Sequence, residues 1–401
     1  MGSMHLSIHA EHCVHQQVTG AACRSCVDAC PREAWRMRND GLGFDDAACD
    51  DCGLCVVACP TEALTLPAPA LLRITDAPRA KVMQSSWLMA CDHAALERQN
   101  SSPSAGRIPC LYAFAPGWLW QQAGAQHIES IVATTGDCTK CPRGAAGADW
   151  HRQWSAVSAA GPTHGPVHPA PTLQIVEPQT WQALAAVAAT QQETMPGRRA
   201  FFRRLAVPTR NAADVATAPL SSNRRWLTQQ LAHPWPSARH RPLWAVDLDE
   251  TRCSACLDCT RLCPTQALRG IGANAGGHDR EQFIVDMAHC IGCGLCVAVC
   301  DDMALRPARP EPSSGGTPPH SLPLQKQVCS ACGMSFYRLV RSPAAQREIS
   351  REKPRERLRE RPLCRACERG QPLRHDRIVQ IEPSAESVGS AGSPPPHPPA
   401  P

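Results

Sequence analysis

Residues 253–264 read CSACLDCTRLCP and residues 290–300 read CIGCGLCVAVC. Each stretch places three cysteines three residues apart and a fourth cysteine four residues after the third. Three thiolates at this spacing on a tight loop can bind three corners of an iron–sulfur cubane, while the fourth reaches the neighbouring cluster. The two stretches therefore predict two interlocked [4Fe-4S] sites, because each motif lends its last cysteine to the other.

A second pair of motifs lies near the N-terminus. Residues 49–60, CDDCGLCVVACP, repeat the complete spacing. In residues 13–31, CVHQQVTGAACRSCVDACP, Gly20 stands where the first cysteine is expected. Cys13 lies seven residues before Gly20, and lengthening a loop by this much adds little closure entropy. We therefore expect Cys13 to replace the missing ligand.

The motifs resemble those of the bacterial two-cluster ferredoxins over about fifty residues in each module. Each copy is followed by a short segment of the type Glu-Ala-Trp, which makes an internal repeat. The resemblance implies electron transfer, and Asp301 is a departure from the family's proline that touches no ligand. The implied ligand sets are Cys253, Cys256, Cys259 and Cys300; Cys290, Cys293, Cys296 and Cys263; Cys13, Cys23, Cys26 and Cys59; and Cys49, Cys52, Cys55 and Cys30.

Other ligands and other uses of the cysteines stay open at this point. His12 or His15 is an alternative to Cys13, and so is a three-iron cluster. Zinc also binds thiolates, although it usually lies between paired Cys-x-x-Cys knuckles. Disulfides would require an oxidising compartment. Residues 1–13 are polar and contain no apolar leader segment, so we expect a cytoplasmic protein.

Composition narrows the remaining function classes. The chain has 401 residues, which suggests several domains, and 24 cysteines. No apolar run approaches the length of a membrane span, so we predict a soluble protein. The net charge of +5 is too small to indicate nucleic-acid binding. No catalytic acid, base or substrate pocket is evident, and we therefore expect an electron carrier and not an enzyme.

The middle of the chain carries four further cysteines. Apolar stretches end at Cys91, Cys110 and Cys138, with Cys141 close behind, and read as strands. Later segments repeat a strand-then-helix order, which predicts a small parallel α/β domain whose strand ends cluster. These cysteines are candidates for a metal or a further cluster; a redox dithiol and unrelated buried cysteines are the alternatives. The GDCTKCP stretch resembles the methyl-viologen-reducing hydrogenase delta subunit.

Two Cys-x-x-Cys knuckles lie near the C-terminus, at Cys329 and Cys332 and at Cys364 and Cys367. Paired knuckles are typical of a zinc ribbon, so we predict one zinc here, with a fifth or sixth cluster as the alternative.

The overall prediction is an α+β protein in which two dicluster modules flank the small parallel α/β domain. Its role is to relay electrons between redox protein partners. The alternatives are an electron-transfer subunit of a larger oxidoreductase and a maturation chaperone for a redox enzyme. The predicted units are a dicluster module at 1–72, the Cys-bearing domain at 80–192, a linker at 193–243, a second dicluster module at 244–308, a linker at 309–324, a zinc-ribbon-like unit at 325–380 and a disordered tail at 381–401.

Overall fold

The structure is a computed structural model of the whole chain with mixed helix and sheet. It describes residues 6–38, 41–67, 72–75, 85–96, 106–159, 169–193, 219–232, 242–271, 281–308, 310, 319–340 and 362–370. None of the helices in these ranges combines the length and the apolar composition that a bilayer crossing requires.

The N-terminal module is built from short elements around its cysteine loops. Strands β1 (Ser7–Ile8) and β4 (Leu64–Thr65) pair antiparallel, and β2 (Trp35–Arg38) and β3 (Gly41–Phe44) form a hairpin. The remaining elements are the 3-10 turns η1 (Ala10–His12) and η2 (Asp46–Ala48) and the helices α1 (Val14–Gln17), α2 (Ser25–Ala29) and α3 (Leu54–Ala58). Gly53 has a φ of 79° immediately before α3, a left-handed conformation that glycine adopts without strain.

The second module repeats this plan. Strands β10 (Ala245–Leu248) and β13 (Leu305–Ala308) pair antiparallel, and β11 (Leu268–Ile271) and β12 (Gln282–Val285) form the hairpin. The cysteine loops carry α9 (Asp258–Leu262), η5 (Met287–His289) and α10 (Leu295–Ala298). Gly294 precedes α10 with a φ of 75°, at the same position as Gly53 in the first module.

A five-stranded sheet occupies the middle segment. Strand β6 (Ser85–Cys91) runs parallel to β7 (Arg107–Ile108) and β8 (Ser130–Thr134), and β8 runs parallel to β9 (Thr172–Ile175). Strand β5 (Leu72–Thr75) adds an antiparallel edge that was not predicted. The remaining elements are η3 (Leu111–Ala113), α4 (Pro116–Ala125), η4 (Pro142–Ala146), α5 (Gly147–Ala159) and α6 (Pro178–Glu193).

The described C-terminal part extends the sheet of the second module. Strand β14 (His320–Val328) pairs with β12 and with β15 (Ser335–Leu339), both antiparallel. Helix α12 (Arg365–Glu368) is the last described element of this C-terminal part. The tail predicted at 381–401 lies outside the described residues.

Two segments predicted as linkers contain packed structure. Helix α8 (Arg224–Ala232) lies within the predicted linker 193–243 and buries Leu227 and Leu231. The strand β14 begins at His320, inside the predicted linker 309–324. These elements were missed because polar residues and prolines separate the few apolar residues that pack, so the local composition resembles that of a linker.

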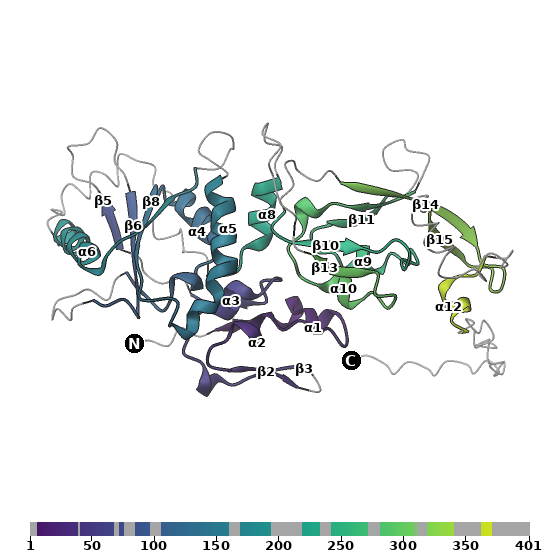
Figure 1. Cartoon of the computed structure of the whole chain (residues 1–401), viewed down its shortest axis with the longest axis horizontal. Coiled ribbons are helices and arrows are strands. Elements are labelled where there is room, and N and C mark those ends of the chain that lie inside the picture. The colour runs from purple at the N-terminus through teal and green to yellow at the C-terminus, as the bar shows by residue number, and fades with distance from the viewer. Residues whose placement is uncertain are drawn as a thin grey trace, which may run out of the picture.

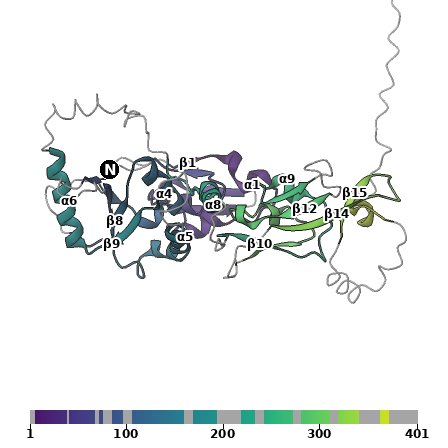
Figure 2. The same ribbon diagram turned by 90° about the horizontal axis from the view of Figure 1, so that it is seen from above.

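The parts lie in a row along the long axis of the molecule. The sheet with β5, β6 and β8 lies at one end, the two modules follow, and β14, β15 and α12 lie at the other end (Figure 1). The view from above gives the same order (Figure 2). The N-terminal module and the sheet share one buried core, in which cysteines such as Cys55 pack with Trp87 and Trp150.

Candidate metal centres

The same backbone turn follows the last cysteine of all four motifs. The residue three positions later is left-handed, with φ between 50° and 58°, at Glu33, Glu62, Gln266 and Met303. The alanine after it is at most 3% exposed, at Ala34, Ala63, Ala267 and Ala304. In two of the motifs the alanine N–H bonds to the cysteine, since Ala34 donates to Cys30 Sγ and Ala304 to Cys300 Sγ, both at 3.3 Å. At Cys263 the donor is the next residue, Leu268, at 3.4 Å. Such bonds stabilise a thiolate and tune a bound cluster.

In the second module, one cysteine set surrounds a hollow. Cys253, Cys256, Cys259 and Cys300 line it, and its open space, including the solvent at its mouth, is about 400 Å³. Burial raises the pKa of Cys259 to about 12, and the neighbouring thiols of Cys253, Cys256 and Cys300 add to the rise. Four thiols so close in a half-buried hollow favour a bound cation or cluster, because metal binding removes their protons.

The other set of this module lies beside the first. Burial raises the pKa of Cys290 to about 11, helped by the thiols of Cys293 and Cys263. Burial also raises the pKa of Cys296, which is affected by the same three thiols and by Cys259 of the adjacent set. The fourth cysteine of each motif thus lies with the three cysteines of the other motif.

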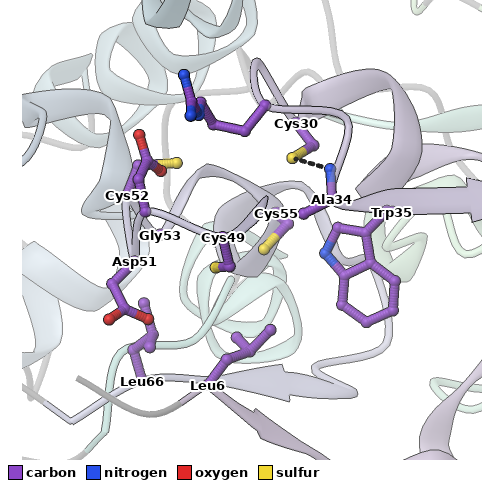
Figure 3. Close-up of a pocket in the computed structure, with 12 residues that line it drawn as sticks. Leu6, Cys30, Ala34, Trp35, Cys49, Asp51, Cys52, Gly53, Cys55 and Leu66 are labelled. Atoms are coloured by element: carbon purple, nitrogen blue, oxygen red, sulfur yellow. Dashed lines mark hydrogen bonds between the residues drawn. The ribbon is translucent and has the colours of Figure 1, made fainter. Parts of the chain in front are cut away.

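The N-terminal module also has a hollow, of about 360 Å³, but it lies at the second motif and is lined by Cys30, Cys49, Cys52 and Cys55. Figure 3 shows these cysteines around one space, with the N–H of Ala34 bonded to Cys30. Burial raises the pKa of Cys52 to about 12.

The remaining set includes the replacement ligand predicted from sequence. Burial raises the pKa of Cys26 to about 12, and the thiols of Cys23, Cys59 and Cys13 contribute. Cys13 therefore lies with the other three. The imidazole of His15 is bonded to the carbonyl oxygen of Cys23 at 2.8 Å, and His12 is exposed. These positions favour Cys13 over either histidine as a ligand.

The middle cysteines gather at one edge of the parallel sheet. Strand β6 ends at Cys91, Cys110 follows β7, and Cys138 follows β8. A hydrogen bond with Cys110 lowers the pKa of Cys91 to about 6, while the same bond raises that of Cys110. Tyr112 links Cys138 to this group. Burial raises the pKa of Tyr112 to about 12, and a hydrogen bond with Cys138 adds to the rise. Cys141 lies on the same loop, at the start of η4.

Arg143 joins this edge to the N-terminal module, and sequence reasoning missed it. Its guanidinium donates to the carbonyl oxygen of Pro109 at 2.6 Å and to Asp50 Oδ2 at 2.8 Å. Pro109 precedes Cys110, and Asp50 follows Cys49. Burial raises the pKa of Asp50, but the hydrogen bond and charge of Arg143 and the hydrogen bonds of Cys52 together lower it, and the net shift is downward. The only sequence signal for Arg143 is its place directly after Cys141-Pro142.

The C-terminal cysteines form the tightest group. The sulfur atoms of Cys329, Cys332, Cys364 and Cys367 all lie within 4.8 Å of one another. The N–H of Cys364 donates to Cys329 Sγ at 3.3 Å. This backbone hydrogen bond is the main cause that lowers the pKa of Cys329 to about 6. The same hydrogen bond would stabilise the thiolate of Cys329 in a metal-bound group.

Helix α12 is held against the second module by ion pairs beside Cys300. Arg365 Nη2 lies 2.9 Å from Asp301 Oδ2, and Arg369 Nη2 lies 2.6 Å from Asp302 Oδ1. Ser254 Oγ also donates to Asp302 at 2.5 Å. Asp301, which stands where the ferredoxin pattern has proline, thus connects the cysteine loop to the C-terminal group.

All 24 cysteines are free thiols, as cluster and metal binding require. Residues 21–64 and residues 245–301 match two different family models, both described as a 4Fe-4S dicluster domain. The chain carries two 4Fe-4S dicluster domains. The prediction of tandem ferredoxin-type dicluster modules is thereby confirmed. Both matches lie outside residues 80–192, so the resemblance of the middle segment to the hydrogenase delta subunit stays a prediction.

Similar proteins of known name match over part of their length. NADH-quinone oxidoreductase subunit I 2 of Streptomyces coelicolor is 29% identical over 106 residues, which are 23% of this chain and 54% of that protein. The Geobacter metallireducens protein of the same name is 31% identical over 77 residues, 18% of this chain and 59% of that one. The archaeal-type glutamate synthase [NADPH] of Thermotoga maritima is 28% identical over 91 residues, 22% of this chain and 17% of that protein. The likeness thus spans little more than half of each subunit I protein and much less of the synthase.

Replacing Cys13 tests the least regular of the predicted ligands in the N-terminal dicluster domain. In Cys13→Ser we expect about one quarter of the iron to be lost, because one of the four predicted clusters would lose a thiolate. Iron and sulfide per chain on anaerobically purified protein measure this. The control is His12→Ala, which should keep full iron. Full iron in Cys13→Ser together with iron loss in His15→Ala would assign the ligand to the histidine.

Proposed function

We propose that the chain relays single electrons through four [4Fe-4S] clusters, two in each dicluster domain. The first domain would use Cys13, Cys23, Cys26 and Cys59 for one cluster and Cys49, Cys52, Cys55 and Cys30 for the other. The second would use Cys253, Cys256, Cys259 and Cys300, and Cys290, Cys293, Cys296 and Cys263. The gathering of each set, the two hollows and the repeated N–H···S turn support this assignment. The clusters would supply the redox chemistry, and the chain supplies thiolates, burial and amide hydrogen bonds.

One observation carries the proposal that the four sites form a single path. Val14, Ala21 and Leu295 form one buried apolar core between the domains. Cys23 of the first domain and Cys293 of the second both pack against it. Within each domain the two sets are also neighbours. Burial is the main cause that raises the pKa of Cys55 and of Cys296, and a thiol of the adjacent set adds to each rise: Cys26 for Cys55, and Cys259 for Cys296. Short steps between buried sites suit electron transfer.

We further propose that Cys91, Cys110, Cys138 and Cys141 bind a metal or a fifth cluster. Three of them meet where parallel strands end, which is where open α/β sheets place their sites. Arg143 sets this group directly beside the Cys49 loop. A fifth cluster there would extend the row of redox sites beyond the first domain.

At the other end of the row we propose a structural zinc. Around one tetrahedral ion with bonds of about 2.3 Å, sulfur atoms lie roughly 3.8 Å apart. The 3.7 Å between the sulfurs of Cys332 and Cys364 fits this spacing. Thiolates on a cubane lie further apart, because each one binds a different iron.

A second candidate is an electron-transfer subunit of a larger oxidoreductase, working in a reducing compartment such as the cytoplasm. It is favoured by the likeness to proteins named as subunit I of NADH-quinone oxidoreductase. This role predicts stable co-purification with a redox partner, whereas a free carrier would exchange electrons without a lasting complex.

An anaerobic redox titration tests the electron-transfer proposal. The full chain, with clusters intact, should accept about four electrons from dithionite, one for each cluster, and return them to an oxidised viologen-type dye. The control is protein stripped of iron, which should take up none in this range. Loaded protein that takes up no electrons reversibly would contradict the proposed function.

A further inference from the structure

One arginine lies between the two dicluster domains. Arg224, the first residue of α8, is 8% exposed. Its Nη1 donates to the carbonyl oxygen of Ile291 at 3.2 Å, and its Nη2 donates to that of Ala58 at 3.0 Å. Ile291 follows Cys290, and Ala58 precedes Cys59. A single guanidinium therefore connects one cysteine loop of each domain.

The guanidinium is held from its flat side as well. Its Cζ lies 4.6 Å from the centre of the Trp244 ring, a cation–π contact. Trp244 in turn packs on Gly292, where an added Cβ would come within 2.6 Å of the ring. Gly292 has a φ of 67° and lies between Cys290 and Cys293. The ring thus clamps Arg224 against the second domain.

The charge of Arg224 acts on both inner cysteine sets. Burial lowers the pKa of Arg224. The carboxylate of Asp149 and then the thiols of Cys59 and Cys23 oppose this effect and favour the charged form, while the charge of Arg152 adds to the lowering. Arg224 in turn lowers the pKa of Cys290 and Cys293, against the larger effect of burial. The sets that flank Arg224 are therefore Cys13, Cys23, Cys26 and Cys59 on one side and Cys263, Cys290, Cys293 and Cys296 on the other.

One donor of this guanidinium is unused. Among the described residues, Nε of Arg224 is buried and has no hydrogen-bond partner. A buried donor without a partner is costly, and native proteins usually provide an acceptor for it. Sulfur atoms of a bound cluster are acceptors that would be present in the loaded protein, so the unused donor fits a cluster on either side.

We propose that Arg224 is a positioning residue that fixes the junction of the two domains, and that its charge raises the reduction potentials of the two clusters flanking it above those of the outer two. The inference rests on the proposed function. Reduction adds one electron to a cluster from an external one-electron donor, and no bond is made or broken. A buried positive charge nearby stabilises the added negative charge because the surroundings screen it poorly. Electrons that enter at either end of the row then settle at the junction.

The test is a potentiometric titration of the full chain, followed by electron paramagnetic resonance. In Arg224→Gln we expect two of the four couples to move to lower potential. At a fixed solution potential, the ratio of oxidised to reduced cluster at these two sites should rise by about tenfold. This corresponds to a reduction potential lowered by about 59 mV for a one-electron couple. The other two couples should stay in place. Arg224→Lys, which keeps the charge, should keep the potentials.

Arg261→Gln is the matched control. Arg261 also lies in a cysteine loop, between Cys259 and Cys263, but its side chain is 77% exposed and pairs with Asp258 at 3.5 Å. Removing this solvent-screened charge should leave all four couples unchanged. Four unmoved couples in a loaded Arg224→Gln protein, or four couples shifted equally, would overturn the proposal.

A measurement on the unaltered chain covers the case in which Arg224→Gln fails to load iron. Protein reduced by two electrons should show a spectrum of two interacting spins, because the first electrons occupy the two neighbouring inner clusters. Two non-interacting spins at this stage would overturn the role of Arg224. A wild-type chain without clusters would instead overturn the proposed function, so the two failures are distinguishable.

Discussion

Removing iron anaerobically with a chelator should unfold both dicluster domains while the parallel sheet stays folded. The helices of these domains, α2, α3, α9 and α10, have only four or five residues and are not stable alone. Without clusters, neutral thiols surround hollows of about 360 and 400 Å³. Amide hydrogen exchange should show protection in α3 and α10 falling by more than about a hundredfold, roughly 2.7 kcal/mol.

The sheet provides the internal control for this experiment. The sheet also packs on α6 through a core of its own, with Leu88, Val132 and Trp181, which is separate from the core shared with the N-terminal module. The amides of β6 and β8 should therefore keep most of their protection. Protection in α3 and α10 that survives complete iron removal would show that the domains fold without clusters.

Replacing Cys364 should empty the C-terminal site and leave the clusters intact. Zinc bound by four such ligands contributes about 10–16 kcal/mol to folding in zinc-finger peptides, and Cys364→Ser removes one of the four thiolates. Cys364 is buried, and its Sγ lies 3.7 Å from that of Cys332. We expect zinc per chain to fall from about one to about zero, with α12 and β15 losing exchange protection, while iron per chain is unchanged.

Ser335→Ala is the matched control, because Ser335 lies exposed on β15 and is no ligand. It should keep its zinc. Two outcomes would contradict the assignment: zinc retained in Cys364→Ser, or iron lost in place of zinc, which would mean that the C-terminal group holds a cluster.

The grouping of the cysteines could be predicted because it depends on local spacing. A loop such as residues 290–300 brings its cysteines together whatever surrounds it, and the ferredoxin resemblance paired the distant fourth cysteine with its set. For the same reason, the strand that ends at Cys91 and the strand that follows Glu129 could be predicted, because their runs of apolar residues are local features of the sequence.

The junction between the domains could not be predicted, because it depends on tertiary contacts. Arg224 is separated by 166 and 67 residues from its partners Ala58 and Ile291. A basic pair in a polar segment normally indicates a solvated surface, and nothing local distinguishes this buried arginine. Asp301 is similar: its departure from the proline pattern was visible in the sequence, but its ion pair with Arg365 required the fold.

The most direct test of the central claim is the iron, sulfide and zinc content of anaerobically purified protein, together with electron paramagnetic resonance after dithionite reduction. Four clusters and one zinc predict about sixteen irons, about sixteen sulfides and about one zinc per chain, with spectra of interacting clusters. About twenty irons would place a fifth cluster on the middle cysteines. Much less iron than zinc would contradict the account, because the dicluster thiolates would then hold zinc and could not carry electrons.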